Sequence, residues 1–171
     1  MTRLDEEAGA IHLKSLGIES LKSGSIERIF PSRFCYTVPK DTGRKTSLGK
    51  SLRNFLETHS SDVVILFSGW GTWPSCENMV IYDRIASSKC DSRKLYEAPY
   101  HRLTFPDDAA TTECLIDVIL YFYWDATLLD VSNQFAIEFT NDEKLFVYTE
   151  ESRKSIEGVA NVFANQGWKE C

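Results

Sequence analysis

The segment 126–148 places the strongest constraint on how this chain can fold. Within it, Phe135, Ile137 and Phe139 alternate with smaller or polar residues, the pattern of a strand with one buried face. Two further apolar stretches flank this strand, one before it and one after it, and a short polar turn separates each from the strand. Because tight turns join antiparallel neighbours, we predict a three-strand meander in the C-terminal part of the chain.

The rest of the chain mixes short apolar strands with amphipathic helices. Five apolar residues at 63–67, rich in β-branched side chains, are typical of a strand buried on both faces. We also predict strands at 34–38 and 100–105, and helices that begin at Thr46 or Ser47, at Ser75, at Pro106 and at Thr149. This mixed order indicates an α+β fold with helices packed on a mostly antiparallel sheet.

The length of 171 residues fits one domain. Residues 1–25 are polar and show weak periodicity, so we expect a weakly ordered N-terminal segment. Residues 26–171 are expected to form the single α+β domain.

Charge is distributed unevenly along the chain. Residues 20–60 carry eight basic and three acidic side chains, whereas residues 103–151 carry one base, Lys144, and eleven acids. A segment this acidic repels nucleic acid and attracts basic partners. The alternative interpretation is a solvated face balanced by the basic N-terminal third.

The sequence predicts a cytoplasmic protein that does not span a membrane. No run approaches the roughly 20 apolar residues of a membrane span, and the acidic N-terminus has no apolar region of a signal peptide. The cysteines are odd in number and have no paired spacing, which indicates free thiols rather than a disulfide framework or a zinc site. They are Cys35, Cys76, Cys90, Cys114 and Cys171.

The segment Gly43–Ser51 nearly matches a phosphate-binding loop. It has five residues between its glycines where that loop needs four. One extra residue redirects the backbone N–H groups that bind phosphate, so we expect no nucleotide cofactor.

Residues with catalytic potential each have a structural explanation. Cys76 lies near a predicted helix start, where a thiolate is favoured, but no histidine forms a local signature with it. Carboxylates can perform acid–base chemistry or bind a metal, yet helix starts and turns also favour them; the candidates are Glu77, Asp125, Asp142 and Glu143. We therefore expect no enzyme activity and no metal. The alternative is a small cytoplasmic enzyme that uses the Glu77 and Asp125 carboxylates or the Cys76 thiol.

The segment Trp70–Asn78 resembles the Trp-Gly-x-Trp-Pro-Ser-x-Glu-Asn motif of a family of small, uncharacterised bacterial proteins. As in that family, a helix ending in Tyr-Trp-Asp follows, and then a strand pair and an acidic turn. The turn often reads Ser-His-Asp-Glu in the family, but it is Thr140–Glu143 here, and the missing histidine argues against a catalytic or metal-binding turn. The resemblance covers about residues 62–149.

These bacterial proteins are similar in size and acidity to immunity proteins, which bind and block a cognate toxin. By that analogy, the expected partner is a toxin protein, itself basic, and the oligomeric state is left open. Tryptophans in a glycine-flanked loop can anchor such an interface, and acidic residues at turns and helix starts can steer the partner. The predicted partner-binding residues are Trp70, Trp73, Asp107, Asp108, Asp142, Glu143, Glu150 and Glu151.

Overall fold

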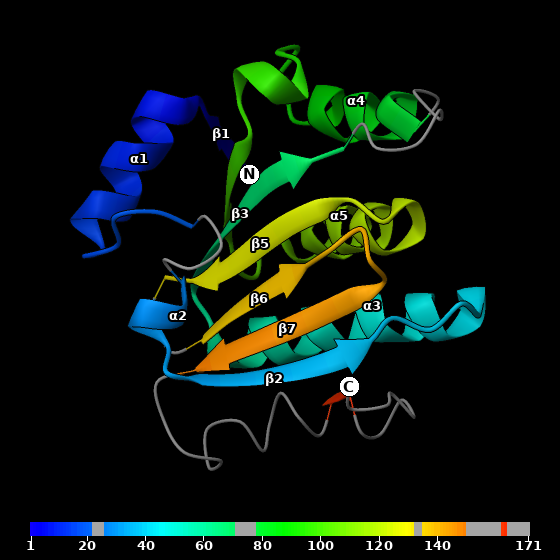
Figure 1. Ribbon diagram of the computed structural model, residues 1–171. Helices are drawn as coiled ribbons and strands as arrows, with labels where there is room; N and C mark the ends of the chain where they lie inside the picture. The colour runs from blue at the N-terminus through cyan, green and yellow to red at the C-terminus, as the bar shows by residue number, and fades with distance from the viewer. Residues whose placement is uncertain (22–25, 71–77, 132–134, 150–161, 164–171) are drawn as a thin grey trace.

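The computed structural model describes residues 1–21, 26–70, 78–131, 135–149 and 162–163 (Figure 1). These residues form a seven-stranded sheet with the order β1-β4-β3-β5-β6-β7-β2, antiparallel at every pairing. The strands are β1 (Thr2–Leu4), β2 (Ser32–Thr37), β3 (Asp62–Gly69), β4 (Tyr100–Thr104), β5 (Asp125–Asp130), β6 (Phe135–Phe139) and β7 (Lys144–Thr149). The predicted α+β class is confirmed, and β5, β6 and β7 form the predicted meander.

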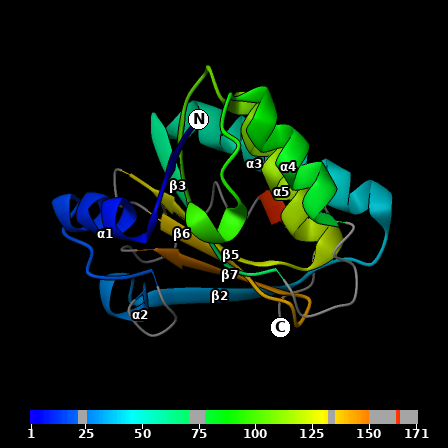
Figure 2. The ribbon, with the colours of Figure 1, turned by 90° about the horizontal axis from the view of Figure 1, so that it is seen from above.

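Helices cover the two faces of the sheet unequally. The described helices are α1 (Glu6–Ser15), α2 (Ile26–Ile29), α3 (Thr42–His59), α4 (Asn78–Ser88) and α5 (Ala109–Phe122), with a 3₁₀ turn η1 (Leu95–Glu97). Figures 1 and 2 show α3, α4 and α5 together on one face and α1 and α2 on the other. We call the first the helical face and the second the open face.

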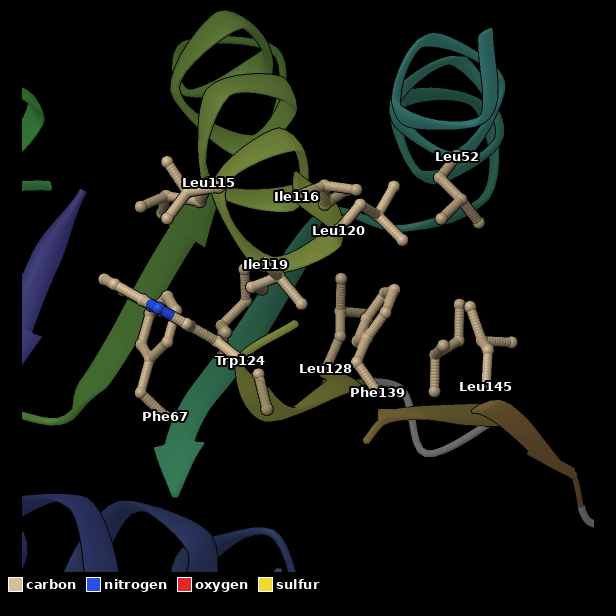
Figure 3. Packing of buried hydrophobic residues seen from close by; sticks show 14 of the residues in the cluster. Leu52, Phe67, Leu115, Ile116, Ile119, Leu120, Trp124, Leu128, Phe139 and Leu145 are labelled. Atoms are coloured by element: carbon tan, nitrogen blue, oxygen red, sulfur yellow. The ribbon is translucent and has the colours of Figure 1, made fainter. Parts of the chain in front are cut away.

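The main core lies between the helical face and α3, α4 and α5. Figure 3 shows Ile119 and Leu120 of α5 pointing at the sheet, where Leu128 and Phe139 meet them. The alternation in β6 sends Phe135, Ile137 and Phe139 into this core, and all three are buried. The strand at 63–67 is buried throughout, as predicted.

A second, smaller core lies under α1 and α2 on the open face. It includes Leu13 and Leu21 from the N-terminal segment, packed with Leu66 and Tyr100 from the sheet. Asp5 caps α1 by accepting a hydrogen bond from the Ala8 backbone N–H at 2.8 Å. Residues 2–15 thus form a strand and a helix rather than the weakly ordered segment that the sequence suggested.

Two helices begin at residues that the sequence did not predict. Helix α3 begins at Thr42, because the Asp41 carboxylate caps it through the Arg44 backbone N–H at 2.9 Å. The sequence 43–51, which resembles a phosphate-binding loop, is therefore helical. Helix α5 begins at Ala109 rather than Pro106, because a turn closed by the Asp108 N–H and the Thr104 carbonyl at 2.9 Å precedes it.

The cysteines differ from the expectation of five free thiols. Cys35 of β2 is disulfide-bonded, whereas Cys90 and Cys114 are free. Among the helices described, none combines the length and apolar character needed to cross a membrane. The predicted helix that begins at Thr149 falls almost entirely outside the described residues.

Candidate functional site

A pocket of about 480 Å³ opens where β3 and β6 end and β5 begins, beside α1 and η1. The described residues that line the pocket are Glu6, Leu21, Leu66, Phe67, Ser68, Trp70, Tyr96, Pro99, Tyr100, Asp125, Thr127, Glu138, Phe139 and Thr140. The pocket therefore brings Trp70, a predicted interface residue, together with Asp125, a predicted candidate acid.

Acidic and aromatic side chains dominate the pocket. Glu6, Asp125 and Glu138 supply carboxylates, and the described lining includes no lysine, arginine or histidine. Five of the lining residues carry aromatic rings. Carboxylates beside aromatic faces form a site for an organic cation, because both attract positive charge.

Asp125 is held in place by the chain on either side of the pocket. Its Oδ1 accepts a hydrogen bond from the Asn141 backbone N–H at 2.7 Å. Its Oδ2 packs so closely on Gly69 that a Cβ there would overlap it. Partial burial, and then the nearby Asp142 charge, raise the pKa of Asp125, although the Asn141 hydrogen bond opposes this rise. The carboxylate would gain from a cation that replaces its lost hydration.

Glu138 is a pocket residue that the sequence analysis missed. It lies in β6 opposite Thr127 of β5, and its Oε2 accepts a hydrogen bond from the Tyr148 hydroxyl at 2.6 Å. It occupies a polar position in the alternation of β6, which predicts only an outward-facing side chain. Register and the contact with Tyr148 make it part of a site.

Trp70 follows β3 directly and is half-buried against the main core. It is therefore partly held by the fold and partly available at the pocket. Trp73, Cys76, Glu77, Glu150 and Glu151, which the sequence also singled out, lie outside the described residues.

Asp108 is placed differently from the exposed position that was predicted. It is 4% exposed. Its Oδ2 lies 2.6 Å from the Met1 ammonium nitrogen and accepts the Thr104 backbone N–H at 3.1 Å, while its Oδ1 lies 3.0 Å from Lys89 Nζ. This carboxylate joins β1, β4 and the start of α5, so its charge is not available to a partner.

The other predicted acidic residues lie at the surface to different degrees. Asp107 and Asp142 are exposed. Glu143 is half-buried, has a left-handed backbone conformation with φ of 59°, and lies 3.9 Å from Lys40 Nζ. Of these three, Asp142 is close enough to Asp125 to raise its pKa.

His101 is buried in the main core and does not face the pocket. Its Nδ1–H donates to the Pro99 carbonyl at 3.2 Å, and its Nε2 accepts the Tyr82 hydroxyl at 2.5 Å. Burial lowers the pKa of His101 to about 3, so the ring is neutral. This histidine supports the core rather than a catalytic site.

Comparisons with known proteins give no relative from which a function could be transferred. No family model matches the chain, and no curated protein or solved structure is significantly similar to it.

Proposed function

We propose that the protein is an immunity-type protein that binds and neutralises a cognate bacterial toxin, and that the toxin is basic. The observation that carries this proposal is the pocket, which combines Trp70 with the carboxylates of Asp125 and Glu138. The described residues that line it contribute negative charge without a compensating base. A basic protein surface is the partner that such a site attracts most strongly.

Two kinds of residue at the pocket are expected to contribute to partner binding in different ways. Exposed charges such as Asp142 contribute little affinity, roughly 0–1 kcal/mol each, but they speed the encounter with an oppositely charged partner. Aromatic residues such as Trp70 supply buried contact area and slow dissociation. We therefore expect Asp142 to control association and Trp70 to control dissociation.

The test is to examine the reading frames beside this gene for a toxin candidate and to co-express the protein with it, followed by measurement of protection and of binding kinetics. Asp142→Lys should slow association and weaken its salt dependence, whereas Trp70→Ala should speed dissociation. Glu57→Lys is the matched control, because it makes the same charge change on α3, across the sheet from the pocket. Absent protection, or equal kinetics for all three variants, would refute the proposal.

A second candidate function is a small enzyme in which Asp125 acts as a general acid or base. It is favoured by the raised pKa of Asp125 inside a pocket, a combination common at catalytic sites. Asp125→Asn distinguishes the two functions. If the protein is an enzyme that acts on the toxin, Asp125→Asn should abolish protection while the toxin still binds. If it is an immunity protein, protection should fall only as far as toxin binding falls.

A further inference from the structure

We propose that the pocket binds a guanidinium group, supplied by an arginine side chain that the partner protein inserts. This inference deepens the proposed function and rests on it for the source of the arginine. The pocket volume of about 480 Å³ is within the range of small-ligand sites and exceeds the need of one side chain. The remaining volume can admit the backbone that carries the side chain.

The three pocket carboxylates have no ion-pair partner among the described residues, although the Arg33 guanidinium lies 3.9 Å from the ring centroid of Phe146, which pairs with Glu138. Within the described part of the chain, neither Glu6, Asp125 nor Glu138 takes part in an ion pair. Elsewhere on the same molecule, the buried Asp108 and the partly buried Asp91 do have cationic partners. A group of carboxylates that line a cavity without ion pairs therefore favours a cation from outside.

Two of these carboxylates are oriented before any ligand arrives. Asp125 uses Oδ1 to accept the Asn141 N–H, and Glu138 uses Oε2 to accept the Tyr148 hydroxyl. In each case the second oxygen accepts no hydrogen bond from a described residue; the Asp125 Oδ2 is covered on one side by Gly69, so a ligand N–H would have to reach it from the other side. Because the internal hydrogen bonds fix the side chains, little conformational entropy is lost on binding.

The aromatic lining favours guanidinium over a lysine ammonium. Guanidinium is planar, stacks on aromatic faces and donates N–H groups in several directions at once. Trp70 after β3, Tyr96 of η1 and Tyr100 of β4 provide rings that line the pocket with the carboxylates. An ammonium group can approach only as a compact charge and keeps its hydration more strongly.

The probe is N-acetyl-arginine amide, whose ends are neutral, and the control ligand is N-acetyl-citrulline amide, which replaces guanidinium with an uncharged urea group. Titration followed by backbone NMR shifts should give a dissociation constant of roughly 1–10 mM for the arginine probe, as expected for one side chain. The citrulline probe should bind at least about tenfold more weakly. The shifts should centre on Asp125 and Glu138.

The variants test the carboxylates individually. Glu138→Gln and Asp125→Asn should each weaken the binding of the arginine probe at least about fivefold, while the backbone NMR spectrum remains that of a folded protein. Glu6→Gln should weaken it less, because Glu6 is exposed. Glu7→Gln is the matched control, since Glu7 is the adjacent exposed residue in α1 and is not among the residues that line the pocket.

The outcomes separate this inference from the proposed function. If the probe binds as described but the toxin candidate does not bind, the guanidinium site stands and the immunity function fails. If the toxin binds but the probe does not compete and Glu138→Gln has no effect on either, the guanidinium site is refuted while the function survives. Equal binding of arginine and citrulline probes also refutes it.

Discussion

Replacing Asp117 by asparagine should stabilise the protein at neutral pH. Asp117 lies on α5 and packs against Gly49 of α3, where a Cβ would overlap its Oδ1. That oxygen is buried and has no hydrogen-bond partner among the residues that the structure describes. Burial, and then the nearby Glu113 charge, raise the pKa of Asp117 to about 6, although Lys50 opposes this rise. The ionised carboxylate is therefore a cost to the folded state.

The sign and size of the effect follow from this shift. Between the ordinary pKa of 3.8 and the folded value of about 6, the folded state binds more protons than the unfolded state. Stability therefore falls as the pH rises through this window, and the full cost is present above it. The difference of about two between the folded and the ordinary pKa of Asp117 corresponds to a free-energy cost of about 3 kcal/mol. Because Asp117 is only partly buried, solvent screening reduces this cost to about 1 kcal/mol.

Asparagine keeps the size of the side chain and removes its charge. Urea denaturation at pH 7.5 should show a gain of about 1 kcal/mol in the free energy of unfolding of Asp117→Asn. The gain should shrink towards pH 4, where Asp117 is already protonated in the folded state. Asp142→Asn, at an exposed turn, is the control and should change stability by less than about 0.5 kcal/mol. A gain that is equal at both pH values would refute the reasoning.

Three further predictions address other contacts. Asp108→Asn should lower the free energy of unfolding by roughly 3 kcal/mol in urea denaturation, because it leaves the Met1 ammonium buried without a counter-charge; an unchanged midpoint would contradict this. Gly9→Ala should cost roughly 1–3 kcal/mol, because the new Cβ would overlap the Tyr100 ring, and thermal denaturation measures the loss. The affinity of the arginine probe should fall with falling pH, and the fall should begin at a higher pH than for an ordinary aspartate, because partial burial raises the pKa of Asp125; Asp125→Asn should make the affinity less dependent on pH.

The sequence predicted those elements whose own residues carry a periodic signal. The meander was predictable because the alternation in β6 survives in the structure as a buried face. The strand at 63–67 was predictable because its apolar run has no polar interruption. In both, local pattern and tertiary burial agree, so no knowledge of distant contacts was needed.

The start of α3 depends on contacts that the sequence does not reveal. Residues 42–46 are polar and include a glycine, which locally favours a loop. In the structure, Lys45 is buried with its Nζ 3.9 Å from the Tyr123 ring centroid, and Thr46 bonds to the Tyr121 hydroxyl at 2.7 Å. These contacts with the end of α5 favour the helical conformation over a loop.

The structure of the N-terminal segment also depends on contacts that the sequence does not reveal. The guanidinium of Arg3 donates to the carbonyls of Arg93 and Lys94 at 2.7 and 2.9 Å. A buried arginine with distant backbone partners leaves no periodic signature, so the sequence predicted weak order where the structure has β1 and α1.

The pocket was predictable only in parts. Trp70 and Asp125 were singled out for different reasons, and no sequence pattern indicates that they are close. They meet because β3 and β5 are neighbours, with Gly69 paired to Asp125. Glu138 was missed because a lone glutamate in an alternating strand is usually a solvated residue.

The structure reduces the number of acidic residues in the second half of the chain that are available to a partner. Several of its acids serve the fold: Asp108 is paired with the Met1 ammonium, Glu113 with Arg53, and Asp130 is buried. Those that remain beside the pocket are Asp125, Glu138 and Asp142. A partner that recognised the whole segment as one acidic face would respond equally to charge reversal at Asp107 and at Asp142, since both are exposed. A partner centred on the pocket would respond to Asp142 alone, so the ratio of the two association rates measures how local the recognition is.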